Sequence, residues 1–407
     1  MEKRNQVVLM PQYMKEFLCL GSDCEANCCG GWYINIDQET YHKYQQLPDI
    51  KWRELLIGNI RINRFNGTPT NYARIKLTRN NKKCPFLSGE GLCRVQLELG
   101  VDYLSPICLN YPRKLNKVNG RLEKSAALSC PEAARLALLN PAGMIFKEVE
   151  EDLSECPVTE SRANKAEAYL LEIRSFTINL LQNRSFSLTH RLIMLGVFCE
   201  KLQEYIQTDK TAQIPLLIST PINHLNQEAA KRTLMTDSLQ PHRQMQLFLK
   251  LIAKKRFYKK KSDDAYGECI REILSGLQHT KEIPIEELLE RYEEAFNNYY
   301  QPFMAEHHYI LENYLVNYVF RNLFPFTGLP SILDEYIILI IYYTLIKMHL
   351  VGMASFHQEL NSNLIIKLIY SFTRLIGHCE EYANYALNLF KGSGYNNAAS
   401  LVALMKK

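Results

Sequence analysis

The stretch CLGSDCEANCCG, residues 19–30, places four cysteines in the spacing C-x4-C-x3-C-C. Two more follow in CPFLSGEGLC, residues 84–93, and one each in CLNYPR, residues 108–113, and CPE, residues 130–132. Thiolates are soft ligands that suit zinc, copper(I) and iron–sulfur clusters. This density of thiols predicts a fold organised by metal, with ligands drawn from Cys19, Cys24, Cys28, Cys29, Cys84, Cys93, Cys108 and Cys130.

Two other interpretations compete with metal binding. An even number of cysteines also suits the disulfide framework of a small secreted domain. The first ten residues, MEKRNQVVLM, are charged and then only briefly apolar, which is not typical of a signal peptide and disfavours that interpretation. Burial of single thiols as small apolar residues is the third possibility. Adjacent Cys28 and Cys29 cannot easily bond to each other, and they suit one metal ligated from several loops or two neighbouring sites.

The residues do not decide whether the metal is zinc or the iron of an iron–sulfur cluster. Zinc sites usually contain two C-x2-C pairs, which this region lacks, and His42 is its only histidine. Cys24 and Cys28 match the first interval of the C-x3-C-x2-C motif of radical S-adenosylmethionine enzymes, but Gly31 stands at the third position. One 4Fe-4S cluster needs four cysteines, so the other four would bind a second metal or pack structurally.

The cysteines lie within phrases that resemble a known family. PQYMKEFLCLGSDCEANCCGGWYINID (residues 11–37), CPFLSGEGLCRVQLELG (84–100), ICLNYPRKL (107–115) and LSCPEAA (128–134) resemble the eight-cysteine metal-chelating domain of the flagellin lysine-N-methylase family. ENYLVNYVFRNLFPF (312–326) is similar to the same family. The resemblance implies a bacterial cytoplasmic enzyme that methylates flagellin lysines, using S-adenosylmethionine and a 4Fe-4S cluster. A non-catalytic zinc- or iron-chelating module, or a metallochaperone, is the alternative function.

Two further sites are candidates for binding or chemistry. Tyr111 and Arg113 lie in the same loop as Cys108, and this position alone predicts that they contact the cofactor. Histidines and tyrosine at 307–309 with Glu312 suit either a lysine-binding or acid–base site or a polar patch between helices. The glycine-rich segment 391–397 follows no strand, so it predicts a helix-ending turn rather than a nucleotide-binding loop. No catalytic residue is assigned.

Composition and periodicity predict a mainly α protein. The 407 residues, 47% hydrophobic and 22% charged, suit a soluble protein of two domains. We expect a small, irregular cysteine-rich α+β domain with few short strands over residues 1–155, then an all-helical domain over 156–407. Residues 61–65 and 72–77 could pair as strands, and Asn119-Gly120 predicts a hairpin of 114–118 with 121–127.

Charge is distributed unevenly. Residues 1–130 hold 19 Lys and Arg against 12 Asp and Glu. These cations could offset the negative charge of a thiolate cluster, hold a cofactor carboxylate, or form an ordinary solvated surface. The basic runs are short, which disfavours nucleic acid as a partner and leaves flagellin, by resemblance, as the expected one.

The most apolar stretch, residues 336–346, is shorter than the roughly 20 residues that span a bilayer. We therefore expect no membrane segment and instead a buried central helix over residues 331–350, apolar nearly all round. Four cysteines lie singly outside the dense region, and we expect them to be packing residues: Cys156, Cys199, Cys269 and Cys379.

Overall fold

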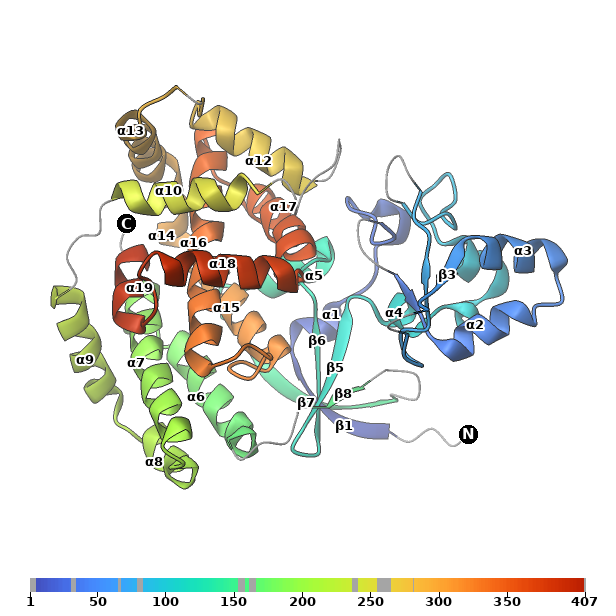
Figure 1. Ribbon diagram of the computed structural model, residues 1–407, viewed down its shortest axis with the longest axis horizontal. Coiled ribbons are helices and arrows are strands. Elements are labelled where there is room, and N and C mark those ends of the chain that lie inside the picture. The colour runs from blue at the N-terminus through green and yellow to red at the C-terminus, as the bar shows by residue number, and fades with distance from the viewer. Residues whose placement is uncertain are drawn as a thin grey trace.

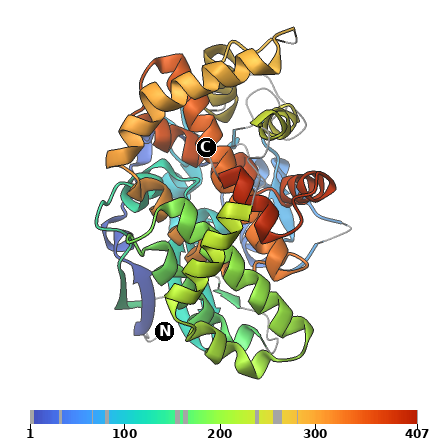
Figure 2. The same cartoon turned by 90° about the vertical axis from the view of Figure 1, so that its left-hand side faces the viewer.

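A helical body and a smaller lobe form the two ends of the molecule, with a β-sheet beside their junction (Figure 1). Seen from the side of the helical body, helices fill the front of the molecule (Figure 2). The predicted class, mainly α with a cysteine-rich N-terminal part of short strands followed by helices, is confirmed. The computed structural model describes residues 5–30, 34–64, 67–78, 83–152, 158–160, 166–235, 241–254, 265–280 and 282–405.

The small lobe has its own three-stranded sheet, in the order β2-β4-β3. The predicted pairing of 61–65 with 72–77 is confirmed for its first residues, because Arg61 lies opposite Arg74 and Ile62 opposite Ala73 in an antiparallel ladder. Residue 65 lies outside the described residues. Asp37 and Asp49 cap the two following helices by accepting from Thr40 N at 2.9 Å and Trp52 N at 3.0 Å. The elements of the lobe are β2 (Asn35–Ile36), α2 (Gln38–Gln45), α3 (Ile50–Gly58), β3 (Ile60–Ile62), β4 (Ala73–Ile75), the π-helical turn Val95–Leu99, the 3-10 turn Val101–Tyr103 and α4 (Pro106–Asn110).

The second sheet has five strands in the order β7-β1-β6-β5-β8. The predicted hairpin is confirmed: Asn119 and Gly120 both have positive φ, 49° and 81°, as a two-residue turn of this type requires. The N-terminal segment was not predicted as a strand, yet it pairs parallel to β6 and antiparallel to β7. The strands are β1 (Asn5–Pro11), β5 (Arg113–Val118), β6 (Arg121–Ala126), β7 (Phe146–Asp152) and β8 (Val158–Glu160).

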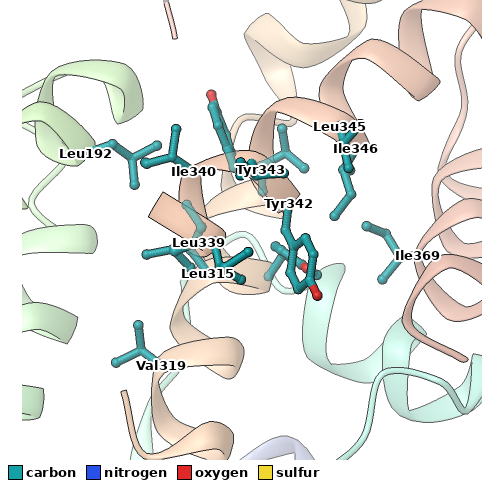
Figure 3. Close-up of a cluster of buried hydrophobic side chains, with 14 of the residues drawn as sticks. Leu192, Leu315, Val319, Leu339, Ile340, Tyr342, Tyr343, Leu345, Ile346 and Ile369 are labelled. Atoms are coloured by element: carbon teal, nitrogen blue, oxygen red, sulfur yellow. The ribbon is translucent and has the colours of Figure 1, made fainter. Parts of the chain in front are cut away.

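The helical body is built around α16 (Ile332–His357), which confirms the predicted central helix. Figure 3 shows side chains of α16, from Leu339 to Ile346, among Leu192, Leu315, Val319 and Ile369 of three other helices. The other helices before and within this body are α1 (Tyr13–Glu16), α5 (Pro131–Leu138), α6 (Leu170–Leu181), α7 (Leu188–Gln207), α8 (Ile214–Ile218), α9 (Ile222–Met235), α10 (Pro241–Ile252), α12 (Ala265–Gly276), α13 (Ile285–Ala295), α14 (Gln301–Glu306), α15 (Tyr309–Asn322), α17 (Ser362–Phe372), α18 (Glu380–Gly392) and α19 (Ala398–Met405).

Among the described residues, α16 is the one helix long and apolar enough to cross a membrane. In its most apolar window, 94% of the residues are buried inside the protein. That burial is the pattern of a core helix, whose apolar residues are covered by neighbouring helices.

The five-stranded sheet shares one apolar core with the helical body. Val8 and Leu115 belong to the same cluster of buried side chains as the residues of α15 and α16. Tyr13 donates its hydroxyl hydrogen to Asn317 Oδ1 at 2.7 Å, and buried Arg174 pairs with buried Glu123. The small lobe has a separate core. The division at residue 155 stays a prediction, and residues 153–157 lie outside the described part of the chain.

Two glycines let α12 and α16 approach closely, and we expect Gly276→Ala to destabilise the protein by about 1–3 kcal/mol. A Cβ at Gly276 would lie 2.5 Å from Phe356 N and 2.7 Å from Gly352 O, and backbone atoms cannot turn aside. The matched control is Gly392→Ala, at the end of α18, where nothing lies within 4 Å of the added atom. Urea unfolding measures both; equal free energies of unfolding would contradict the expectation.

Candidate functional site

A cavity of about 290 Å³ lies where the small lobe meets α5 and the residues that follow α17. Every one of the eight predicted ligands lines it, although they come from four separate stretches of chain. The structure thus brings the whole predicted set together: Cys19, Cys24, Cys28, Cys29, Cys84, Cys93, Cys108 and Cys130.

Backbone hydrogen bonds hold the cysteine loops against one another. Cys84 N donates to Cys29 O at 2.7 Å, which joins the second loop to the first. Asn27 accepts from Cys29 N at 2.7 Å and donates through Nδ2 to Gly91 O at 2.6 Å. Cys93 pairs with Leu87 in a β-bridge. These bonds fix where the loops cross, so thiols distant in sequence face one space.

Two helices, α4 and α5, position the last two thiols. Cys108 lies inside α4, and burial raises its pKa to about 12. Cys130 is the residue at the N-terminal cap of α5, and burial raises its pKa to about 11. Burial therefore keeps both thiols protonated at neutral pH in the protein without metal.

Cys28 and Cys29 act as a pair. A hydrogen bond from the Cys29 side chain lowers the pKa of Cys28 to about 7, with a smaller contribution from the guanidinium of Arg374. The same hydrogen bond, followed by burial, raises the pKa of Cys29. Cys28 also interacts electrostatically with Cys24, Cys84, Cys108 and Cys130. Cys28 is therefore the thiol that interacts electrostatically with most of the others. It is also the most readily deprotonated of the thiols whose pKa is shifted.

The donor set fits a thiophilic metal by its chemistry. Eight thiols and no histidine line the cavity. Within the described ranges, however, no three Cys, His, Asp or Glu side chains are placed so that they could hold one ion as they stand. Metal binding therefore requires thiol side chains to turn toward a common centre and to lose their protons.

The predicted cofactor residues, Tyr111 and Arg113, both line this cavity. Tyr111 donates its hydroxyl hydrogen to Ser129 Oγ at 3.1 Å, and burial raises its pKa to about 12. The Arg113 guanidinium lies 4.9 Å above the centre of the Phe17 ring. Their position beside the thiols supports a cofactor contact, and that role stays a prediction.

Sequence reasoning missed Arg374, which reaches the cavity from the helical body. Its two terminal nitrogens donate to Asn27 O at 3.2 Å and to Ser129 O at 3.1 Å. Each acceptor directly precedes a candidate ligand, Cys28 or Cys130. A single arginine in a helical region carries no sequence signal for this role, because its acceptors are more than 200 residues away.

The polar residues around Glu312 form a patch between helices, as one of the two interpretations held. Glu312 is completely buried, and it pairs with Arg184 at 2.8 Å and with Arg191 at 2.7 Å. Asn313 Nδ2 donates to the backbone oxygens of Leu138 and Asn140. These groups bond to one another and to nearby backbone oxygens, and they do not line the thiol cavity.

The isolated cysteines pack in or against the helical core, and no described one lines the cavity. Cys199 and Cys269 are completely buried, and Cys379 packs partly buried against the same core. The expectation for these three is confirmed, whereas Cys156 lies outside the described residues. The glycine-rich segment after α18 is a turn, as predicted, since the helix ends at Gly392.

Eight thiols at one cavity, mounted against a helical body, place this chain among cysteine-rich proteins suited to metal. Residues 174–404 match the model of the FliB lysine N-methylase C-terminal domain. The chain belongs to the FliB lysine N-methylase family. It is therefore an enzyme, a lysine N-methylase, and so a methyltransferase.

Characterised relatives agree with this assignment. The chain is 24% identical over 389 residues to the lysine-N-methylases of Salmonella choleraesuis and Salmonella typhimurium, covering 92% of this chain and 93% of each relative. It is 34% identical over 141 residues to the flagellar biosynthetic protein FliU of Salmonella muenchen, covering 35% of this chain and 82% of that protein. No solved structure matches the chain.

Proposed function

We propose that this methylase transfers methyl groups from S-adenosylmethionine to flagellin lysines in the bacterial cytoplasm, with an iron–sulfur cluster at the cysteine-lined cavity. The observation that carries the proposal is the gathering of all eight thiols at one cavity beside Tyr111 and Arg113. A reducing cytoplasm keeps such thiols available as ligands. The name of the relative FliU supports a flagellar substrate.

Four of the eight thiols would hold a 4Fe-4S cluster, which supplies an iron centre whose charge and redox state the surrounding residues tune. The remaining thiols would bind a second metal or pack around the first. Zinc is the alternative occupant of the same ligands. Arg374 offsets negative thiolate charge here, because its guanidinium lowers the pKa of Cys28.

The cavity also suits the substrate's side chain in its reactive form. A lysine ε-amine has a pKa near 10.4 in water and needs a free electron pair to accept a methyl group. Apolar residues of the cavity wall, such as Phe17 and Phe86, disfavour a charged ammonium group, and the cations Arg113 and Arg374 repel it. Both effects favour the neutral, nucleophilic amine without an assigned catalytic base.

Anaerobic purification followed by methylation of flagellin tests the proposal. We expect iron and sulfide in the protein, little zinc, and flagellin lysines that gain mass in steps of one CH2 when S-adenosylmethionine is added. Protein that has lost its cluster but keeps its helical signal should lose this activity. The control is the same depleted protein after reconstitution with iron and sulfide.

Three results would count against the proposal. Full activity without iron would leave the cluster a structural role only. If the active protein contains zinc instead of iron, the metal in the proposal would be zinc rather than an iron–sulfur cluster. Iron binding without methylation of flagellin would point to a different protein substrate.

A further inference from the structure

Four basic side chains gather where the five-stranded sheet meets the helical body. Lys114 lies on β5, Arg321 near the end of α15, Arg374 in the π-helical turn Thr373–Gly377, and His378 directly after it. Figure 1 places β5, α5 and the start of α18 near this junction. Arg321, Lys114 and Arg374 all act electrostatically on His378. In the described part of the chain, no carboxylate forms an ion pair with any of the four.

The positive charge of this group is not balanced by a nearby negative side chain among the residues that the structure describes. Burial, and then the neighbouring charge of Arg321, lower the pKa of Lys114 to about 8. Burial, followed by its three basic neighbours, lowers the pKa of His378 to about 3, although the residue is exposed at the surface. At neutral pH His378 is therefore uncharged, and the positive charge lies on Lys114, Arg321 and Arg374. Like charges held together are costly unless an anion joins them.

Arg321 adds a second, independent sign of a missing partner. Its terminal nitrogen Nη1 donates to Asn322 Oδ1 at 2.7 Å. Its Nε is buried and has no hydrogen-bond partner in the structure. Buried polar groups are almost always paired, and an arginine matches a carboxylate through several donors at once. The group therefore has the charge and the donors of a carboxylate site.

This basic group adjoins the thiol cavity through Arg374, which lines it. Ser129 stands between them: Tyr111 donates to its Oγ at 3.1 Å, and His378 Nε2 lies 3.1 Å from the same oxygen. Arg374 donates to Ser129 O at 3.1 Å. Tyr111 and Arg374 also line the cavity itself. A molecule with a carboxylate at one end could thus contact the basic group while its other end faces the thiols.

We propose that Lys114 and Arg321, with Arg374 and His378 beside them, bind the carboxylate of the amino-acid end of S-adenosylmethionine. The inference rests on the proposed function, since it assumes that S-adenosylmethionine is the methyl donor. Placing the carboxylate here would leave the sulfonium end of the cofactor on the cavity side of Tyr111 and Ser129. Lys114 and Arg321 are then positioning residues for the cofactor.

Two ligands distinguish the carboxylate from the rest of the cofactor. S-adenosylhomocysteine carries the amino-acid end, whereas 5′-methylthioadenosine keeps the nucleoside and the sulfur but lacks it. We expect Lys114→Met, in anaerobically purified full-length protein, to weaken S-adenosylhomocysteine binding by about tenfold or more in calorimetry. Binding of 5′-methylthioadenosine and the iron content should stay unchanged. Arg321→Gln should show the same selective loss.

The matched control is Lys117→Met, which removes the same charge from an exposed position of the same strand and should change neither affinity. Equal affinities in the parent and both site variants would overturn the inference alone. So would a loss shared equally by the two ligands, or a loss of iron in Lys114→Met, which would assign the cations to the metal site. If the parent binds neither ligand, the proposed cofactor is wrong and the inference falls with it.

Discussion

Replacing Cys28 by serine is expected to abolish metal binding and to unfold the small lobe. Cys28 is the thiol whose pKa is lowered, and it interacts with a thiol from each of the other three cysteine stretches, Cys84, Cys108 and Cys130. The lobe's own core is small, so it depends on other sources of stability. In structural sites the metal supplies on the order of 10 kcal/mol to folding. Losing the central ligand should remove most of that contribution.

Metal analysis and limited proteolysis measure this effect together. Cleavage should move into residues 34–108, while the helical body keeps its unfolding transition, because its core does not depend on the thiols. The matched control is Cys379→Ser: this cysteine lies outside the cavity at the N-terminal cap of α18, where serine is a favourable residue. Unchanged metal content and unchanged proteolysis in Cys28→Ser would show that the lobe folds without metal.

Glu312→Ala is expected to cost the helical body about 3–5 kcal/mol of unfolding free energy. The substitution leaves the Arg191 side chain, only 2% exposed, without its carboxylate partner. Arg184 also loses its partner, but it is 36% exposed, so water can replace part of the interaction. The cost comes from an uncompensated charge in the core rather than from the volume removed.

Urea unfolding of the helical transition measures this cost. The matched control is Glu39→Ala, which breaks a pair whose side chains are 48% and 80% exposed and should change stability by less than about 0.5 kcal/mol. Methylation per folded molecule should stay the same in Glu312→Ala, because Glu312 does not line the cavity. Loss of methylation with unchanged stability would instead indicate that Glu312 has an acid–base role.

Local signals carried most of what could be predicted. Asn119-Gly120 predicts its hairpin because a two-residue turn needs positive φ at both positions. The apolar run of residues 336–346 predicts a buried helix because only a core can cover it on all sides. Strand β1 escaped prediction because its partners begin more than a hundred residues later and its own apolar segment is short.

The sequence by itself determined the ligand chemistry: eight thiols in dense groups indicate a soft metal, whatever path the chain takes between them. It also determined that helices follow them. Only the tertiary structure decided that Arg374 holds the backbone beside Cys28 and Cys130, and that Lys114 and Arg321 meet next to the cavity. The physical reason is that metal affinity follows from residue type, whereas electrostatic interaction depends on distance in space. Residues hundreds of positions apart acquire that distance only when the chain folds.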